Sequence, residues 1–97
     1  MPTYISLCRW TQQGAQKIKE SPSRLDSARK AFESFGVKMR DFYMTTGQYD
    51  MVIVSDAPDD ASIAKAMLSV ASGGSVKSET MRAFNEDEYR KVIGALG

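Results

Sequence analysis

Histidine is absent from the 97 residues, and cysteine occurs only once. Without histidine the chain cannot supply a Ser-His-Asp triad, a two-histidine metal site or a proximal haem ligand. A single cysteine forms neither an internal disulfide nor a cysteine-rich zinc site. These absences exclude several common catalytic and metal-binding classes, and we expect no cofactor. The lone cysteine also favours a reducing compartment, so we expect a cytoplasmic protein.

Excess charge and long apolar runs are also missing. Lysine and arginine number 13 against 12 aspartate and glutamate, which gives a formal net charge of +1. This balance predicts no nucleic-acid partner and no anionic membrane surface as a partner. No stretch approaches the roughly 18 apolar residues that span a bilayer, and the first residues do not resemble a signal peptide. The length fits one domain, which we expect to cover residues 1–97.

Residue spacing predicts an order of strands and helices along the chain. The predicted strands cover residues 3–10, 37–46, 49–56 and 75–84. A helical turn is expected at 15–20, and a helix capped by Ser23, with Asp26 three residues later, is expected to end at Gly36. A second helix is expected to open at 57–60 and end at 72–74, and Asn85 is expected to cap a short C-terminal helix.

This β-α-β-β-α-β order is the ferredoxin-like pattern of the α+β class. It predicts a four-stranded antiparallel sheet with two helices on one face, plus the short C-terminal helix. The first and third strands should be central, because residues 51–54 are apolar at every position. The second and fourth strands carry several charged side chains, which suits sheet edges.

Both faces of the predicted sheet are rich in apolar side chains. In the first strand, alternation places Ile5 and Leu7 on one face and Tyr4, Cys8 and Trp10 on the other. In the third strand, Val52 and Val54 lie opposite Met51 and Ile53. Two helices can cover only one face, and an exposed apolar face usually marks an interaction surface. We therefore predict a homodimer with the sheets packed face to face. The alternative is that the C-terminal helix folds over the second face within one chain.

The segment Gly47-Gln48-Tyr49-Asp50 resembles the name motif of the GYD domain family of small bacterial and archaeal proteins. Other segments are similar to family positions, namely residues 10–14, 19–22, 42–46, 56–60 and 80–84. Asp56 departs from the glutamate expected there. The resemblance covers about residues 3–93 and implies a ferredoxin-like, dimeric α+β-barrel fold. It implies no established activity.

Five residues are candidates for ligand binding. The Tyr49 hydroxyl and the Asp50 carboxylate can bind a polar ligand or transfer a proton, while Arg9 and Arg82 can recognise an anion. Trp10 can line an aromatic pocket. Each has a structural alternative: Tyr49 and Asp50 can stabilise a hairpin, the arginines can form ion pairs, and Trp10 can pack in the core or at a dimer contact.

Metal and RNA binding receive less support. Asp56, Asp59 and Asp60 are grouped, but capping of a helix N-terminus explains Asp59 or Asp60 without a cation, so we predict no metal site. RNA-recognition modules share this topology, but their third strand carries basic and stacking aromatic residues. Residues 49–56 are acidic and lack that aromatic pair.

The sequence thus favours a non-catalytic homo-oligomeric module, with a small ligand held between helices and sheet as a further option. The alternative is a cofactor-independent enzyme of the dimeric α+β-barrel type, a monooxygenase or isomerase. In that enzyme Tyr49, Asp50 or Arg82 would steer a substrate that supplies its own reactivity. An enzyme of this kind needs an apolar pocket into which two or three polar groups converge.

Overall fold

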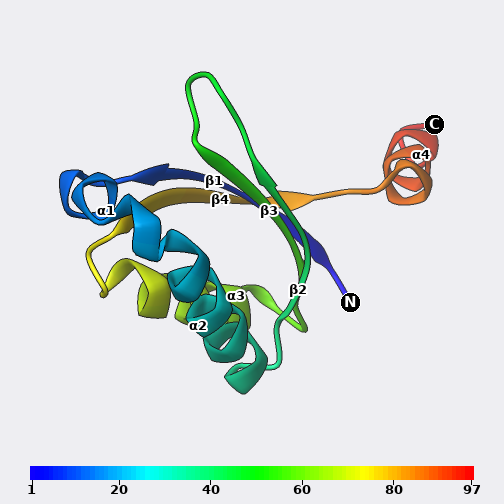
Figure 1. Ribbon diagram of the computed structural model, residues 1–97. Coiled ribbons are helices and arrows are strands. Elements are labelled where there is room, and N and C mark those ends of the chain that lie inside the picture. The colour runs from blue at the N-terminus through cyan, green and yellow to red at the C-terminus, as the bar shows by residue number, and fades with distance from the viewer.

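A four-stranded antiparallel sheet organises the chain in the computed structural model, which describes residues 1–97 (Figure 1). The strands are β1 (Thr3–Trp10), β2 (Lys38–Met44), β3 (Met51–Asp56) and β4 (Val76–Ala83). They lie in the order β2-β3-β1-β4, and each neighbouring pair is antiparallel. The predicted central positions of the first and third strands are therefore confirmed.

Two long helices pack on one side of this sheet. The helical elements are α1 (Gln12–Gln16), the 3-10 turn η1 (Ile18–Glu20), α2 (Ser21–Ser34), α3 (Asp60–Ala71) and α4 (Glu86–Gly94). Figure 1 shows α2 and α3 side by side beneath the same sheet face, and α4 apart from both. The α+β class is thus confirmed. No helix has both the length and the apolar character needed to cross a membrane.

Local hydrogen bonding sets the start of two of the three longest helices. The Asp59 carboxylate accepts a hydrogen bond from the Ser62 N–H at 2.8 Å and begins α3, as expected. Asn85 and Glu88 form a complete capping box at α4. The predicted cap at Ser23 is wrong, because α2 already begins at Ser21. Pro22 lies in the first turn of α2, where the missing N–H of a proline costs nothing. The 3-10 turn η1 leads directly into α2.

The core lies between the sheet and helices α2 and α3. Tyr4 and Cys8 of β1 and Met51 and Ile53 of β3 point into it, while Ile5, Leu7, Val52 and Val54 face the other way. From the helices, the most deeply buried apolar side chains are Phe32, Ile63, Ala66 and Met67. The core is completed by Val37, Met39 and Ala57.

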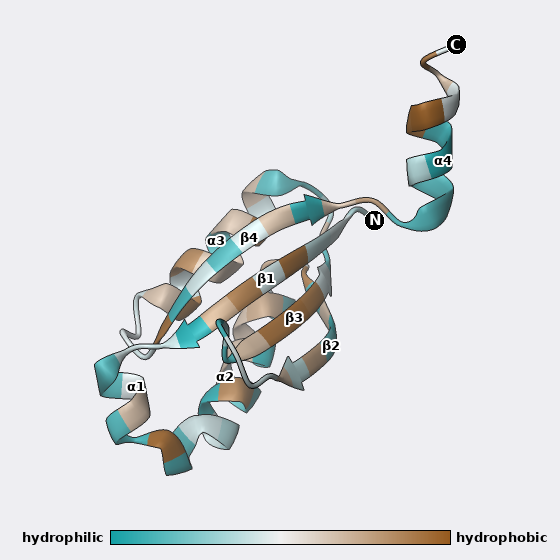
Figure 2. Cartoon of the chain, turned by 90° about the horizontal axis from the view of Figure 1, so that it is seen from above, coloured by the Kyte–Doolittle hydropathy of each residue, from teal (hydrophilic) through white to brown (hydrophobic).

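No helix covers the opposite face of the sheet. We call it the helix-free face and define it by Ile5, Leu7, Tyr43, Val52, Val54 and Met81. Met81 is 44% exposed and Tyr43 is 60% exposed. In both ribbon views α4 projects beyond the end of β4 rather than over the sheet (Figures 1 and 2). The alternative in which the C-terminal helix covers this face is therefore wrong, and the apolar residues of α4 are themselves exposed.

Two serine side chains are completely buried within the sheet. The Ser6 hydroxyl shares a hydrogen bond with the Thr80 hydroxyl at 2.9 Å and also contacts the Met67 sulfur. The Ser55 hydroxyl has no hydrogen-bond partner. Burying an unpaired hydroxyl costs free energy, because its bonds to water are lost and not replaced.

Replacing Ser55 by alanine should therefore stabilise the fold. We expect S55A to raise the free energy of unfolding by about 1 kcal/mol, as measured by chemical denaturation. The matched variant S6A should lower it by about 1 kcal/mol, because the bond to Thr80 is lost. A loss of stability in S55A equal to that in S6A would contradict this account.

Candidate functional site

Arg9 and Tyr49 meet where the hairpin between β2 and β3 passes the end of β1. The Arg9 Nε donates a hydrogen bond to the Gln48 carbonyl at 2.8 Å, and its guanidinium lies 4.8 Å from the centre of the Tyr49 ring. The Tyr49 hydroxyl donates to Glu79 Oε2 at 3.0 Å. Arg9, Tyr49 and Glu79 thus form one polar cluster at an end of the helix-free face.

Asp50 connects the same hairpin to the backbone of β1. Its carboxylate accepts a hydrogen bond from the Trp10 N–H at 3.0 Å, and its own N–H donates to the Cys8 carbonyl at 2.9 Å. The Thr45 N–H donates to the Asp50 carbonyl at 2.8 Å, and the Thr45 hydroxyl donates to the Tyr49 carbonyl at 2.6 Å. These bonds make Tyr49 and Asp50 a structural junction that connects the end of β1, the residue after β2 and the start of β3. We call it the hairpin junction.

The electrostatics of Tyr49 favour a protonated hydroxyl. The hydrogen bond to Glu79, with smaller effects of burial and of the Glu79 charge, raises the pKa of Tyr49 above its ordinary value. At neutral pH this side chain is therefore a hydrogen-bond donor and not a general base.

Arg82 lies far from this cluster. It pairs with Tyr4 in the sheet register, whereas Trp10 at the other end of β1 pairs with Val76. The Arg82 guanidinium contacts the Glu88 carboxylate at 2.9 Å and lies 4.6 Å from the centre of the Phe84 ring. The hydrogen bond from Arg82 is the main reason that the pKa of Glu88 lies below its usual value. Arg82 therefore attaches α4 to the sheet.

The three grouped aspartates have separate roles. Asp56 forms an ion pair with Arg40 at 3.0 Å, and Asp59 caps α3. The hydrogen bond from the Ser62 side chain, followed by the one from the Ser62 N–H, lowers the pKa of Asp59. Asp60 accepts a hydrogen bond from the Tyr4 hydroxyl, which raises the pKa of Tyr4. No group of three or more acidic or cysteine side chains is arranged to hold a metal ion.

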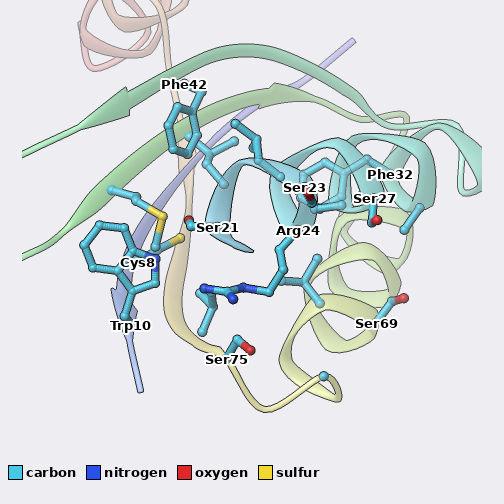
Figure 3. Close-up of a pocket in the computed structure, with 18 of the residues that line it drawn as sticks. Cys8, Trp10, Ser21, Ser23, Arg24, Ser27, Phe32, Phe42, Ser69 and Ser75 are labelled. Carbon is cyan, nitrogen blue, oxygen red and sulfur yellow. The ribbon is translucent and has the colours of Figure 1, made fainter. Parts of the chain in front are cut away.

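A cavity of about 630 Å³ separates part of α2 from the sheet. The Trp10 side chain lines this cavity (Figure 3). The backbone N–H of the same residue belongs to the hairpin junction, where it donates to the Asp50 carboxylate. Cys8 lines the cavity too, and burial raises the pKa of its thiol to about 11, which keeps it protonated. Phe32 closes the end nearest the C-terminus of α2.

The cavity exists because α2 presents several small side chains on the side that faces the sheet. Ser21, Ala28 and Ala31 line the space where larger residues would fill it. Arg24 shares that lining, and sequence reasoning missed it. No local signal distinguishes it, because the same helix also carries Arg29 and Lys30 and only the packing of α2 against the sheet shows which of the three lies beside the cavity.

Arg24 is held in place by backbone carbonyls. One terminal nitrogen of its guanidinium donates to the Lys17 carbonyl at 2.8 Å and the other to the Gly14 carbonyl at 3.2 Å. Gly14 itself packs against the Ser75 backbone so closely that a Cβ atom would lie 2.2 Å from the Ser75 oxygen. Thr11 fixes the same contact through a bond from its hydroxyl to the Gly74 carbonyl at 2.6 Å. The guanidinium is thus positioned beside the cavity.

Comparison with known proteins gives a family match along most of the chain. The model of the GYD domain matches residues 4–93. A relative from Thermus thermophilus, named glutamine synthetase and cystathionine beta-lyase binding protein, is 42% identical over 84 residues. That match covers 86% of this chain and 88% of the relative.

A solved structure also resembles this fold. The crystal structure of the protein TTHA0845, also from Thermus thermophilus, superposes with a TM-score of 0.57, covering 88% of this chain and 95% of that one. The two sequences are 22% identical, so the likeness supports the fold alone.

Asp50 should contribute to stability through the hairpin junction. We expect D50A to lower the free energy of unfolding by about 2 kcal/mol, because the carboxylate bond to the Trp10 N–H is lost. The control D87A removes an exposed carboxylate of α4 and should change stability by less than about 0.5 kcal/mol. Denaturant titration measures both, and equal stabilities for D50A and the parent protein would refute the structural role.

Proposed function

The chain belongs to the GYD domain family, and we propose that it is a small homodimeric module that binds other proteins. The observation that carries this proposal is the helix-free face, an apolar sheet surface that no element of the same chain covers. The related protein whose name describes it as binding glutamine synthetase and cystathionine beta-lyase supports protein partners of the metabolic-enzyme class.

A second copy of the chain is the proposed occupant of the helix-free face. Its two central strands present apolar side chains, and the edge strands place Asp41 beside Val54 and Glu79 beside Leu7. Paired polar groups lie toward both ends: the Arg9–Tyr49–Glu79 cluster at one end and the Arg40–Asp56 ion pair at the other. An apolar centre with a polar rim is typical of protein interfaces. Two such faces related by a two-fold axis remove each other's apolar surface from water. With a net charge of +1, two copies repel each other little.

The exposed stripe on α4 is the proposed contact for the enzyme partner. We define the α4 stripe by Tyr89, Val92 and Ile93, which recur at helical spacing along α4, together with Leu96 in the turn that follows it. All four are about half exposed or more, and Leu96 reaches 78%. Because α4 stands away from the sheet, the stripe can enter a groove on another protein.

The arrangement of the candidate polar groups supports binding more than turnover. The Asp50 carboxylate accepts a backbone N–H, Tyr49 donates to Glu79, and Arg82 pairs with Glu88. Each group that an enzyme would use to steer a substrate thus has a partner within the chain. The structure does contain an apolar cavity with polar groups, but Tyr49, Asp50 and Arg82 do not line it. The position and pairing of these three residues therefore support the non-catalytic hypothesis over the cofactor-independent monooxygenase or isomerase.

Sedimentation at micromolar concentration should give twice the mass of the chain. Val52→Lys places a charge in the centre of the helix-free face and should convert the dimer to a monomer, because a buried unpaired ammonium is costly. Met81→Lys, on the edge strand of the same face, should act in the same direction. Circular dichroism checks that each variant is folded.

The matched control is Leu68→Lys, at a 70% exposed position on the outer side of α3. This variant should remain dimeric. A monomeric parent protein, or dimers that survive both V52K and M81K, would disprove the proposed interface.

Partner binding is measured with purified glutamine synthetase and cystathionine beta-lyase from the same source cells. We expect immobilised parent protein to bind at least one of them, and Val92→Lys to weaken that binding about tenfold or more, because it breaks the α4 stripe. Leu68→Lys should bind as the parent does. Absence of binding to either enzyme would count against this choice of partners, and loss of the dimer in V92K would assign α4 to self-association instead.

A further inference from the structure

We propose that the cavity between α2, α3 and the sheet binds a small amphipathic carboxylate, with its apolar body inside the cavity and its carboxylate on Arg24. This site is separate from the proposed function, because it lies on the helix-covered side of the sheet and the proposed dimer uses the other side. Failure of one proposal therefore leaves the other standing.

The size and lining of the cavity fit a small organic molecule. Its volume of about 630 Å³ lies within the range of about 300–1,000 Å³ that is usual for ligand sites. Twelve of its 20 lining residues are hydrophobic. The sheet contributes Trp10, Met51 and Ile53 to the walls, and the helices contribute Leu25, Phe32 and Val70. Walls of this kind take up an aliphatic chain or an aromatic ring.

Arg24 gives the cavity a site for negative charge. Figure 3 shows its side chain extending from α2 into the cavity. A guanidinium carries five N–H groups, and two of those of Arg24 donate to the carbonyls of Lys17 and Gly14. The remaining N–H groups are available to a ligand. Because the two carbonyls fix the guanidinium in place, little side-chain freedom is lost when a carboxylate binds.

The only acidic side chain that lines the cavity is Glu20, and it leaves Arg24 largely available. The two side chains are 4.0 Å apart, at the limit of an ion pair, and the Glu20 side chain is 64% exposed. Exposed pairs at this distance contribute little free energy, so a carboxylate held in the cavity can compete for the guanidinium.

Serine hydroxyls add further hydrogen-bond donors for an anion. Ser21 and Ser23 of the first turn of α2 line the cavity. The Ser75 hydroxyl lies along the same lining. A carboxylate near Arg24 is therefore surrounded by donors, whereas the rest of the cavity suits an apolar body.

The chain contains its own reporter of occupancy. Trp10 is the single tryptophan, and its indole lines the cavity, so its fluorescence should change when a ligand enters. The probe is decanoate, kept below the concentration at which it forms micelles, and the neutral comparison is 1-decanol. We expect saturable binding of decanoate and at least about tenfold weaker binding of decanol, because only the carboxylate pairs with the guanidinium.

Three variants test separately whether binding needs the charge of Arg24 and the free volume of the cavity. Arg24→Met should weaken decanoate binding about tenfold or more and leave decanol binding unchanged. Arg29→Met is the matched control, because Arg29 lies on the same helix, pairs with Asp26 at 3.7 Å and does not line the cavity. Ala28→Phe should fill the cavity and weaken both probes without loss of thermal stability.

The outcomes decide the proposal even if Arg24→Met fails to fold, since the comparison of decanoate with decanol on the parent protein and on A28F remains. No saturable fluorescence change with decanoate would overturn the site. Equal affinities for decanoate and decanol would overturn the role of Arg24, as would unchanged decanoate binding in a folded R24M variant. Decanoate binding that survives A28F would show that the ligand binds outside the cavity.

Discussion

The structure depends on one mismatch: the central strands are apolar on both faces, but the two helices that pack on the sheet cover only one of them. On the covered side, Tyr4, Cys8, Met51 and Ile53 meet the helices and form the core. On the other side, Ile5, Leu7, Val52 and Val54 remain half-buried. Because α4 stands apart, the chain does not correct this mismatch by itself. The open sheet surface is therefore an apolar area that the chain leaves uncovered and that the proposed dimer would remove from water.

The covered side has a mismatch of its own. Phe32 of α2 is completely buried, but Ser21, Ala28 and Ala31 of the same helix line the cavity at positions where a larger side chain would fill it. Helix α2 therefore contributes both to the packed core and to the wall of the cavity. The contacts of Arg24 with the carbonyls of Gly14 and Lys17 hold the first part of this helix in place.

Most of the fold could be predicted from the sequence because short-range signals dominate it. Strand β1 and the caps at Asp59 and Asn85 follow from alternation and side-chain hydrogen bonding. The start of α2 could not be predicted this way, because Pro22 within the first turn competes with the capping signal of Ser23. The candidate site is harder still. Arg9, Tyr49 and Asp50 are brought together with the Trp10 backbone, but Arg82 is placed at the opposite end of β1. The position of Arg24 beside the cavity results from the long-range packing of α2 against the sheet, which no local sequence pattern predicts.

The contact between Gly14 and the Ser75 backbone has a consequence for how this chain tolerates mutation. Any other residue at position 14 would place a carbon atom 2.2 Å from a carbonyl oxygen of the main chain, and backbone yields far less easily than a side chain. The α1 turn would have to move away, and Thr11 would lose its bond to the Gly74 carbonyl. A glycine in the middle of an ordinary polar segment is therefore among the least replaceable residues in the molecule. In a saturation mutagenesis scan it should stand out against its exposed neighbours Gln12 and Ala15.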